Sequence, residues 1–308
     1  MAFAALLAVL VWFCPLDPLY KPQLGYGGSP EYMALFTPQA PWREAAAHVG
    51  VFKLYPQWLE QATDEQLRTQ FADLRRRKVA VAIEYGVLTA SAGCGTGIEG
   101  FGGEKLVGVA RRIASLGGTL RYVAMDEPFF WSTLYAGQNA CRWTPAETAA
   151  NAAVNIKALL AEFPAVEVGD VEPTGFSNLA YVERYRESIE AFKSSVGFAP
   201  AFFHVDEAWD PATFPADLVA VRRMLARERV PFGIIDDGNP RDASDAAWIA
   251  SAERHLADAE RAAGPADQVV FQSWHRFPKK LLPETDSDAF TWLIAHYFSR
   301  VGPAARTP

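Results

Sequence analysis

The stretch that decides the fold is LRYVAMDEPFFW, residues 120–131. An apolar run of this length, preceded by a Gly-Gly turn, is typical of a buried parallel strand rather than a helix. Parallel strands are apolar along their length because helices cover both faces of their sheet. The run ends in Asp126 and Glu127, and α/β folds build their sites at the carboxyl ends of such strands. Taken alone, the stretch also fits a simpler interpretation, in which Asp126 caps a helix and Glu127 lies in a solvated loop.

The same strand-then-helix pattern recurs along the chain. We expect further strands at residues 24–28, 49–55, 79–85, 166–172, 201–207, 232–237 and 268–274. The helices that follow the strands are expected at 41–48, 63–78, 104–116, from 144 onward, 182–196, 215–229, 243–263 and 287–300. Strict alternation predicts a parallel sheet, and eight such units in about 280 residues fit a single closed (β/α)8 TIM barrel. An open doubly wound sheet is the alternative, but no GxGxxG follows the first expected strand.

Two of the expected helices carry a recognisable start signal. Thr63 and Gln66 have the spacing of a capping box, and Thr144 and Glu147 have the same spacing. In a capping box the hydroxyl accepts from the backbone three residues on, and the longer side chain accepts from the backbone of the capping residue. Both pairs therefore predict where a helix begins.

Composition narrows the class of partner. Hydrophobic residues make up 50% of the 308-residue chain, which is enough for one sizeable core. The formal net charge is −7, and no cluster of basic residues with interleaved aromatics reverses that balance. The sequence therefore argues against nucleic acid as a partner. It contains no Cys/His cluster with zinc spacing, and we predict neither a metal nor a cofactor.

The first 13 residues, MAFAALLAVLVWF, are uninterrupted apolar. That length matches the apolar region of a signal peptide better than a membrane span, which needs roughly 20 residues. We therefore expect residues 1–20 to be a signal or anchor, residues 21–308 to form the barrel, and the protein to be secreted or periplasmic. An N-terminal segment packed against the domain of a cytoplasmic protein is the alternative. Cys14 would leave with a signal, while Cys94 and Cys141, in loops after neighbouring strands, could pair.

Acidic residues gather where the predicted strands end. Five consecutive strands carry them, namely Glu84, Asp126 with Glu127, Glu172, Asp206 with Glu207, and Asp236 with Asp237. Helix N-caps account for some acids, but not readily for acids on five strands in succession. In a barrel all of these ends lie on one face, so we expect an acidic functional cleft there. The second strand ends with Lys53 and Tyr55, and the eighth with Trp274 and His275.

Strand periodicity indicates which of these side chains face the barrel interior. In the third strand the bulky valines and isoleucine would face the helices, which leaves Glu84 facing inward. In the sixth strand the same pattern turns His204 and Asp206 inward. It also turns Asp126 inward and leaves Glu127 at the rim. Periodicity is least reliable at the last residue of a strand, because bulges cluster there.

Tryptophans fall on the same predicted face. Five of the nine lie at strand ends or in the loops that follow, namely Trp58, Trp131, Trp143, Trp209 and Trp274. Aromatic faces stack on the C–H surfaces of sugar rings, so carboxylates together with tryptophans indicate a carbohydrate partner. Packing of the rings against the tops of the helices is the alternative for about half of them.

These residues resemble the (β/α)8-barrel glycoside hydrolases of the clan-A type. That family carries Asn-Glu-Pro at the end of strand four, where the Glu is the general acid/base, and a nucleophilic Glu at the end of strand seven. Here strand four ends in Asp126, Glu127 and Pro128, so the resemblance implies the acid/base role for Glu127. Strand seven ends in Asp236 and Asp237 without a Glu, which departs from the family pattern.

We therefore predict a glycoside hydrolase that acts on a poly- or oligosaccharide through two carboxyl groups. One must stay protonated and the other ionised, and a like charge at Asp126 would raise the pKa of Glu127. Glu127 is the predicted acid, with Asp237 or Glu207 as its partner. A carboxyl separation of roughly 5 Å would mean retention, and roughly 6.5–9.5 Å inversion. The residues expected to bind the sugar are Lys53, Tyr55, Glu84, Asp126, Glu172, His204, Asp206, Trp209, Asp236, Trp274 and His275.

Three other kinds of barrel are alternatives. A barrel that binds a glycan without cleaving it would explain the missing Glu on strand seven. A metal-dependent hydrolase would need a His-x-His at the first strand, where we expected Gly25, Tyr26 and Gly27. A phosphate-binding barrel would need a run of glycines in the loops after strands seven and eight, and the sequence has none there.

Overall fold

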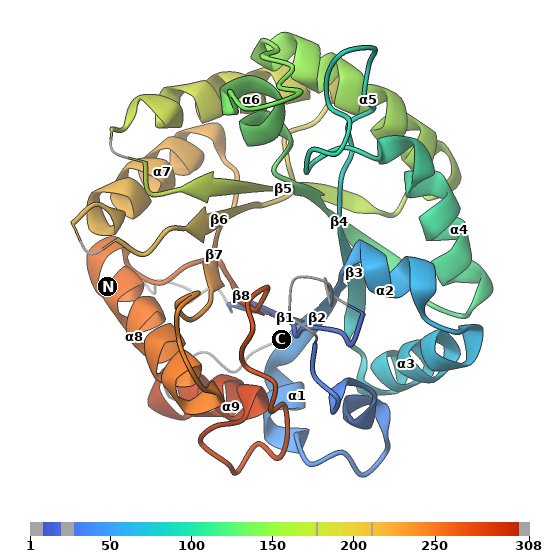
Figure 1. Ribbon diagram of the computed structural model, residues 1–308, viewed down its shortest axis with the longest axis vertical. Coiled ribbons are helices and arrows are strands. Elements are labelled where there is room, and N and C mark those ends of the chain that lie inside the picture. Colours follow the sequence, from blue (N-terminus) through green and yellow to red (C-terminus); the bar gives the residue numbers. More distant parts are fainter. Residues whose placement is uncertain (1–8, 20–27, 177, 211, 302–308) are drawn as a thin grey trace, which may run out of the picture.

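The chain folds into one closed barrel of parallel strands, ordered β1 to β8 around the ring. The computed structural model describes residues 9–19, 28–176, 178–210 and 212–301. Figure 1 shows the strands as a ring at the centre, enclosed by helices. The strands are β1 Leu10–Cys14, β2 Val49–Leu54, β3 Ala80–Tyr85, β4 Leu120–Asp126, β5 Glu167–Thr174, β6 Phe203–Glu207, β7 Phe232–Asp236 and β8 Gln268–Gln272. The expected (β/α)8 barrel is therefore confirmed.

Helices follow the strands and cover the outside of the barrel (Figure 1). They are α1 Arg43–His48, α2 Pro56–Gln61, α3 Asp64–Arg77, α4 Leu106–Ser115, α5 Pro145–Glu162, α6 Ala180–Val196, α7 Phe214–Glu228, α8 Asp245–Ala263 and α9 Phe290–Val301. Among the described residues, the shorter helical turns are η2 Tyr32–Phe36, η3 Gly103–Lys105 and η4 Phe130–Leu134. Seven of the eight expected strands, β2 to β8, are present with small changes at their ends. None of the helices in the described ranges is long and apolar enough to cross a membrane.

The first strand corrects the sequence analysis. β1 is Leu10–Cys14, which pairs with β8 on one side and β2 on the other. These residues belong to the apolar segment that we had set apart from a barrel beginning at residue 21. Cys14, expected to leave with a signal, is a buried free thiol in this strand. The strand expected at 24–28 lies, except for its last residue, outside the described residues.

The reason for the error is physical. A barrel strand is buried on both faces, so its sequence is apolar at every position, as that of a signal segment is. Trp12 and Phe13 are neighbours in β1, and neither has any exposed surface. Trp12 packs inside the barrel against Tyr122 and Phe202, whereas Phe13 packs outside it against Trp42 and Phe290. Adjacent residues therefore fill the two separate layers of the core.

The two layers follow the alternation of each strand. The inner layer contains small and bulky side chains from all eight strands or their first flanking residues, including Trp12, Val51, Ala82, Ala124, Val171, Phe202, Ile235 and Val270. The outer layer lies between barrel and helices and includes Val81, Ile83, Phe203 and Val205. The predicted orientation of the third and sixth strands is confirmed.

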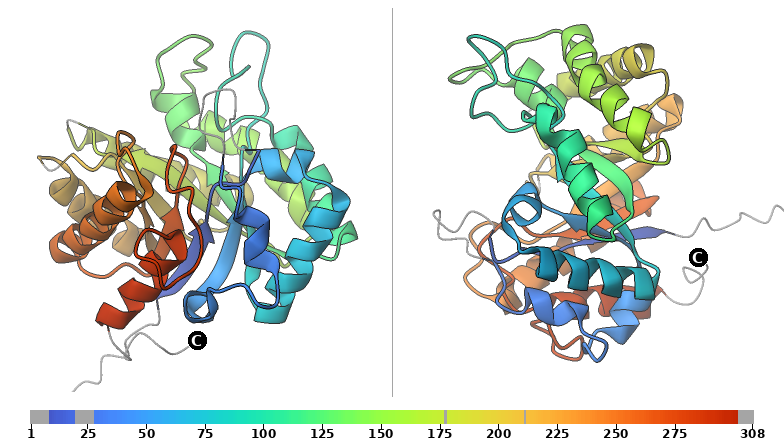
Figure 2. Two further views of the ribbon diagram at one scale, coloured as in Figure 1. Left: turned by 60° about the horizontal axis from the view of Figure 1, so that its bottom comes forward. Right: turned by 90° about the vertical axis from the view of Figure 1, so that its right-hand side faces the viewer.

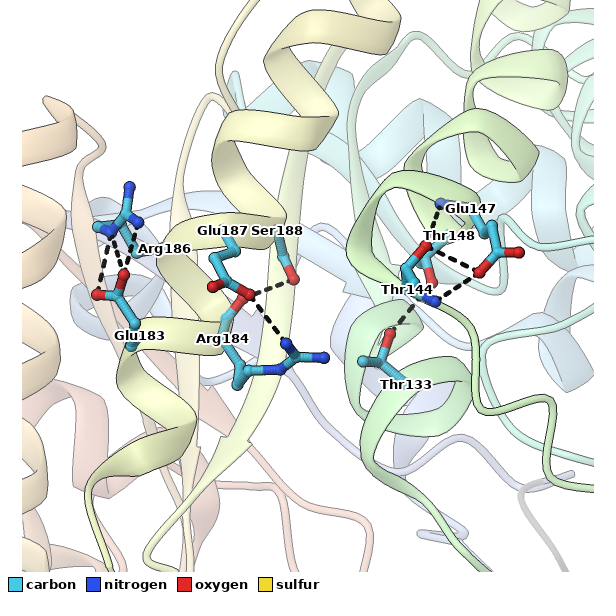
Figure 3. A network of polar contacts seen from close by, with 9 residues as sticks. All are labelled: Thr133, Thr144, Glu147, Thr148, Glu183, Arg184, Arg186, Glu187 and Ser188. Carbon is cyan, nitrogen blue, oxygen red and sulfur yellow. Dashed lines mark hydrogen bonds and ion pairs between the residues drawn. The ribbon is translucent and has the colours of Figure 1, made fainter.

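Both predicted capping boxes are present, at the starts of α3 and α5. Thr144 and Glu147 exchange hydrogen bonds at the first turn of α5, which Figure 3 shows from close by. In the same turn Thr148 contacts Thr133, so the end of η4 is tied to the start of α5. A helix cap of this type stabilises a protein by about 1 kcal/mol.

The loops that follow β3 and β4 rise together at one end of the barrel (Figure 2). A disulfide joins Cys94 in the first loop to Cys141 in the second, as the sequence had allowed. The backbone N–H of Gly95 donates to the carbonyl of Asn139 at 2.9 Å, which adds a second link beside the disulfide. These contacts hold the two loops next to the carboxyl ends of the strands.

Candidate active site

A cleft of about 270 Å³ lies at the carboxyl ends of the strands. Its lining brings together several residues that the sequence analysis had singled out, namely Tyr55, Glu84, Asp126, Glu127, Asp206 and Trp274. Gln57, Glu99 and Gln272 complete its polar surface. The cleft therefore contains side chains from strands or loops on opposite sides of the barrel.

The end of β4 turns so that two successive acids reach the cleft. Successive residues of a strand point to opposite faces, which would direct Glu127 away from Asp126. Glu127 instead has a φ of 50°, in the left-handed region that is unfavourable for any residue except glycine. Its N–H donates to the carbonyl of Val171 at 3.1 Å, which fixes the turn to β5. Strained backbone of this kind is common at functional sites.

Glu127 and Asp206 face one another across the cleft, and their carboxyl groups share a hydrogen bond. Burial raises the pKa of Glu127 well above its usual range, and the charge of Asp206 raises it further. Burial likewise raises the pKa of Asp206, whereas the hydrogen bond with Glu127 lowers it. The pKa values of both carboxyl groups are therefore raised, and the pair favours holding a proton between them. The indole N–H of Trp131 donates to Oε2 of Glu127 at 2.7 Å and fixes the orientation of that carboxyl.

The floor of the cleft is a network around Glu84. The buried ammonium of Lys53 forms an ion pair with Oε2 of Glu84. The amide Nε2 of Gln272 donates to Oε1 of the same carboxylate at 3.3 Å. Next to this network, burial raises the pKa of Asp126, and the charges of Glu99 and Glu84 raise it further. Lys53, Glu84 and Asp126, each predicted at the end of a strand, therefore lie close together.

Asp237 is held beside the cleft by three aromatic side chains. The indole of Trp209 donates to its Oδ1 at 2.5 Å, and Nε2 of His275 lies 3.5 Å from Oδ2. His255 stacks on the Trp209 ring with the ring centres 4.5 Å apart. Burial raises the pKa of Asp237, while its contacts with His275 and Trp209 lower it. Trp209 thus positions Asp237, and it is not part of the cleft lining.

Three of the predicted acids point away from the cleft. Glu207 follows Asp206 in β6, faces outward, and accepts from the hydroxyl of Thr174 at 2.8 Å. Glu172 faces outward from β5 and accepts from two backbone N–H groups at the start of η4. Asp236 is fully buried on the helix side of β7. These positions correct the expected roles of the three acids at the sugar. Strand alternation sends the two acids of each doublet to opposite faces, and it also turns Glu172, a single acid, toward the helices.

His204 also lies outside the cleft. It is fully buried in the barrel interior, where its Nε2 is 2.8 Å from Oε1 of Gln268 and its ring stacks on Phe202. Burial lowers its pKa to about 3, so the ring is neutral. His204 did face inward as expected, but it lies too deep to contact a ligand.

Sequence reasoning missed Glu99 and Gln272. Gln272 has the same parity as Val270 and Trp274 in the eighth strand, so periodicity could have found it. Glu99 lies in a glycine-rich loop, and no local pattern predicts its position. Gly100 permits the placement, because a side chain there would meet the carbonyl of Asp126 at 2.9 Å and its φ is 84°. Within the described residues, no cluster of three or more His, Cys, Asp or Glu is arranged to hold a metal ion.

Comparison with known proteins shows the fold. No family model and no curated protein matches the sequence. A fungal β-1,4-galactanase has a TM-score of 0.56 at 10% identity, over 94% of this chain and 100% of its own. A Plasmodium falciparum fructose-bisphosphate aldolase has a TM-score of 0.55 at 12% identity, over 97% of this chain and 92% of its own. The protein N2152 from Neocallimastix frontalis has a TM-score of 0.54 at 11% identity, over 95% of this chain and 68% of its own. At these identities the similarity places the chain among (β/α)8 barrels.

Proposed function

We propose that the protein is a glycoside hydrolase that cleaves a poly- or oligosaccharide at this cleft. The observation that carries the proposal is the pair of buried carboxyl groups of Glu127 and Asp206, which interact with one another and whose pKa values are both raised. Hydrolysis of a glycosidic bond requires one protonated and one ionised carboxyl group, and a pair that shares one proton can supply both. The similarity to a fungal β-1,4-galactanase supports the proposal at the level of the fold, because the two sequences are only 10% identical.

In the proposed reaction Glu127 donates its proton to the leaving glycosidic oxygen. Its carboxyl is already oriented by Trp131, so little reorganisation is required. The ionised Asp206 either attacks the anomeric carbon or activates a water molecule. Substrate entering between the two groups separates them, and the bound separation decides the outcome. About 5 Å gives retention, and about 6.5–9.5 Å gives inversion.

Asp237 is the second candidate for the ionised partner. Trp209 and His275 both direct hydrogen-bonding groups at its carboxyl oxygens, which stabilises the charged form. Its charge also raises the pKa of Asp206, so the two acids are close neighbours. Asp206→Asn and Asp237→Asn therefore separate the two assignments, because the true partner is the one whose loss abolishes turnover.

Aromatic side chains supply the surface on which a sugar ring would stack. Trp274 is partly exposed in the cleft, and Tyr55 lies beside it with its hydroxyl donated to the carbonyl of Ser273 at 2.8 Å. Glu84 would contact sugar hydroxyls at the floor, whereas Lys53 lies buried beneath it and pairs with Glu84, which corrects its expected role at the sugar. The disulfide between Cys94 and Cys141 supports secretion or export to the periplasm, because disulfides persist in oxidising compartments.

The test is hydrolysis of a panel of polysaccharides by the wild type and by Glu127→Gln. We expect a loss of at least about 10²-fold in the variant, the scale of general acid–base catalysis. Glu207→Gln is the matched control, because this neighbouring glutamate of β6 faces away from the cleft and should keep the wild-type rate. Full activity of Glu127→Gln would refute its role as the acid. Binding of a glycan by a wild type that cleaves nothing would favour a non-catalytic binding barrel.

A further inference from the structure

The cleft is strongly acidic. Five carboxyl side chains line it, namely Glu84, Glu99, Asp126, Glu127 and Asp206. No lysine, arginine or histidine is among the described residues of the lining. The Lys53 ammonium is already paired with Glu84 beneath the floor. Burial raises the pKa values of Asp126, Glu127 and Asp206, so a cation bound in the cleft would stabilise the ionised forms of these acids.

The acidic lining discriminates between classes of sugar. A uronic acid or a sulfated sugar would be repelled, because like charges in a partly buried site interact strongly. A neutral sugar would find few hydrogen-bond donors in this cleft. It would also leave the repulsion between the carboxylates uncompensated. A positively charged substituent would relieve that repulsion, which already raises the pKa of Asp126.

Gln272 provides an independent indication. Only 2% of its surface is exposed, and its Nε2 is committed to Oε1 of Glu84. Gln272 lines the cleft, and its Oε1 is buried in the wall, where no group among the described residues donates a hydrogen bond to it. An acceptor buried without a donor is unfavourable, so a bound ligand that donates there would stabilise the complex. The Oε1 and Nε2 atoms of Gln272 cannot exchange places, because the Glu84 carboxylate is an acceptor and requires the amide N–H.

Carboxylates and an amide oxygen together form a set of acceptors, and the ligand must supply the donors. A protonated amine carries three donors, no acceptor and a positive charge. We propose that the cleft binds a sugar with a protonated, unacetylated amine, and that the substrate of the hydrolase is an amino-sugar polymer. The proposal rests on the proposed function for its reaction. The amine would lie near Glu84, Asp126 and Gln272, which leaves Glu127 and Asp206 for the glycosidic bond.

Glu99 would contribute from the rim of the cleft. Its carboxylate is exposed and its charge acts on both Asp126 and Glu127. The disulfide-linked loops hold it there through Gly100, which packs directly on the backbone of β4. Charge at this position would attract a cationic chain before it enters the cleft.

The experiment measures binding with the non-hydrolysing Glu127→Gln protein, so that turnover does not interfere. Glucosamine and galactosamine are titrated by calorimetry, alongside their N-acetyl derivatives and the neutral sugars glucose and galactose. Chitosan, chitin and cellulose oligosaccharides of equal length follow, since they share one linkage and differ only at carbon 2. We expect the amino sugars to bind at least about tenfold tighter than either counterpart, as an additional charge-assisted contact implies.

The preference should also depend on salt and on Glu99. Raising the salt from about 20 mM to about 500 mM should remove most of it, because ions screen partly exposed charges. Adding Glu99→Gln should weaken the binding of the amino sugars only. Glu65 is an exposed glutamate in the first turn of α3, and Glu65→Gln should leave the binding of every sugar unchanged. Equal or tighter binding of the neutral or N-acetylated sugars would refute the inference. So would a preference that persists unchanged in high salt.

Failure of this inference is distinguishable from failure of the proposed function. Preference for the amine is measured by binding, and catalysis is measured by the loss of turnover in Glu127→Gln. If the protein hydrolyses neutral polymers and this activity depends on Glu127, the proposed hydrolase function stands and the proposed preference for amino sugars is refuted.

Discussion

Replacing Glu207 by glutamine should change how the stability of the protein depends on pH. This glutamate is buried between the ends of β5 and β6, and only 3% of its surface is exposed. Burial raises its pKa to about 7, against 4.5 for an exposed glutamate, and the charge of Asp217 raises it further. Hydrogen bonds from Thr174 and from the backbone lower the pKa without cancelling the effect of burial.

The sign of the effect follows from proton binding. The folded protein binds this proton more tightly than the unfolded chain, so its contribution to stability is fully present below pH 4.5. The contribution is lost as the pH rises through 7. At about 1.4 kcal/mol for each tenfold difference in proton affinity, the loss is about 3 kcal/mol. A glutamine is neutral throughout, so Glu207→Gln should gain about that much relative to the wild type between pH 4 and pH 8.

The assay is urea unfolding followed by circular dichroism at several pH values in this range. Each acid elsewhere in the cleft also titrates, and therefore the informative quantity is the difference between variant and wild type at each pH. Glu65→Gln, at an exposed position of α3, should give a flat difference. A flat difference for Glu207→Gln as well would refute the buried, protonated state of this carboxyl.

Two further predictions concern parts of the chain that hold the site in place. Replacing Cys94 and Cys141 by serine opens a loop with a sequence separation of 47, which should lower the free energy of unfolding by about 4 kcal/mol. An unchanged urea midpoint would contradict that expectation. Trp12→Ala should cost about 3–5 kcal/mol, because the indole fills the inner core of the barrel. Stability like that of the wild type would mean that Leu10–Cys14 is dispensable for the barrel.

Much of the fold could be predicted because barrel strands and helices leave regular patterns. Apolar runs followed by amphipathic helices located β2 to β8, and the capping boxes located the starts of α3 and α5. β1 could not be distinguished by the same reasoning, since residues that pack on both sides of a strand resemble a signal segment. Its pairing with β2 and with β8, the latter more than 250 residues away, identifies it as a strand.

The site was predicted less completely, for two physical reasons. Strand alternation is local, but the turn that ends a strand depends on contacts with its neighbours. Asp206 faces the cleft and Glu207 faces the helices, as alternation requires. At the end of β4, however, the left-handed backbone of Glu127 brings both acids of the doublet to one side. Glu99 comes from a loop placed by a disulfide, and a single sequence indicates neither its direction nor its distance.

Two residues with left-handed backbone lie just beyond the ends of strands at the site. Glu127 and Trp209 both have a φ of 50°. Glu127 directly follows β4, and Trp209 lies two residues after the end of β6. Such backbone costs about 1–3 kcal/mol and persists only where the surrounding structure determines it. The first turn presents the carboxyl of Glu127 to Asp206, and the second presents an indole N–H to Asp237. Backbone strain retained at both turns supports a functional role for them, one in the cleft and the other beside it.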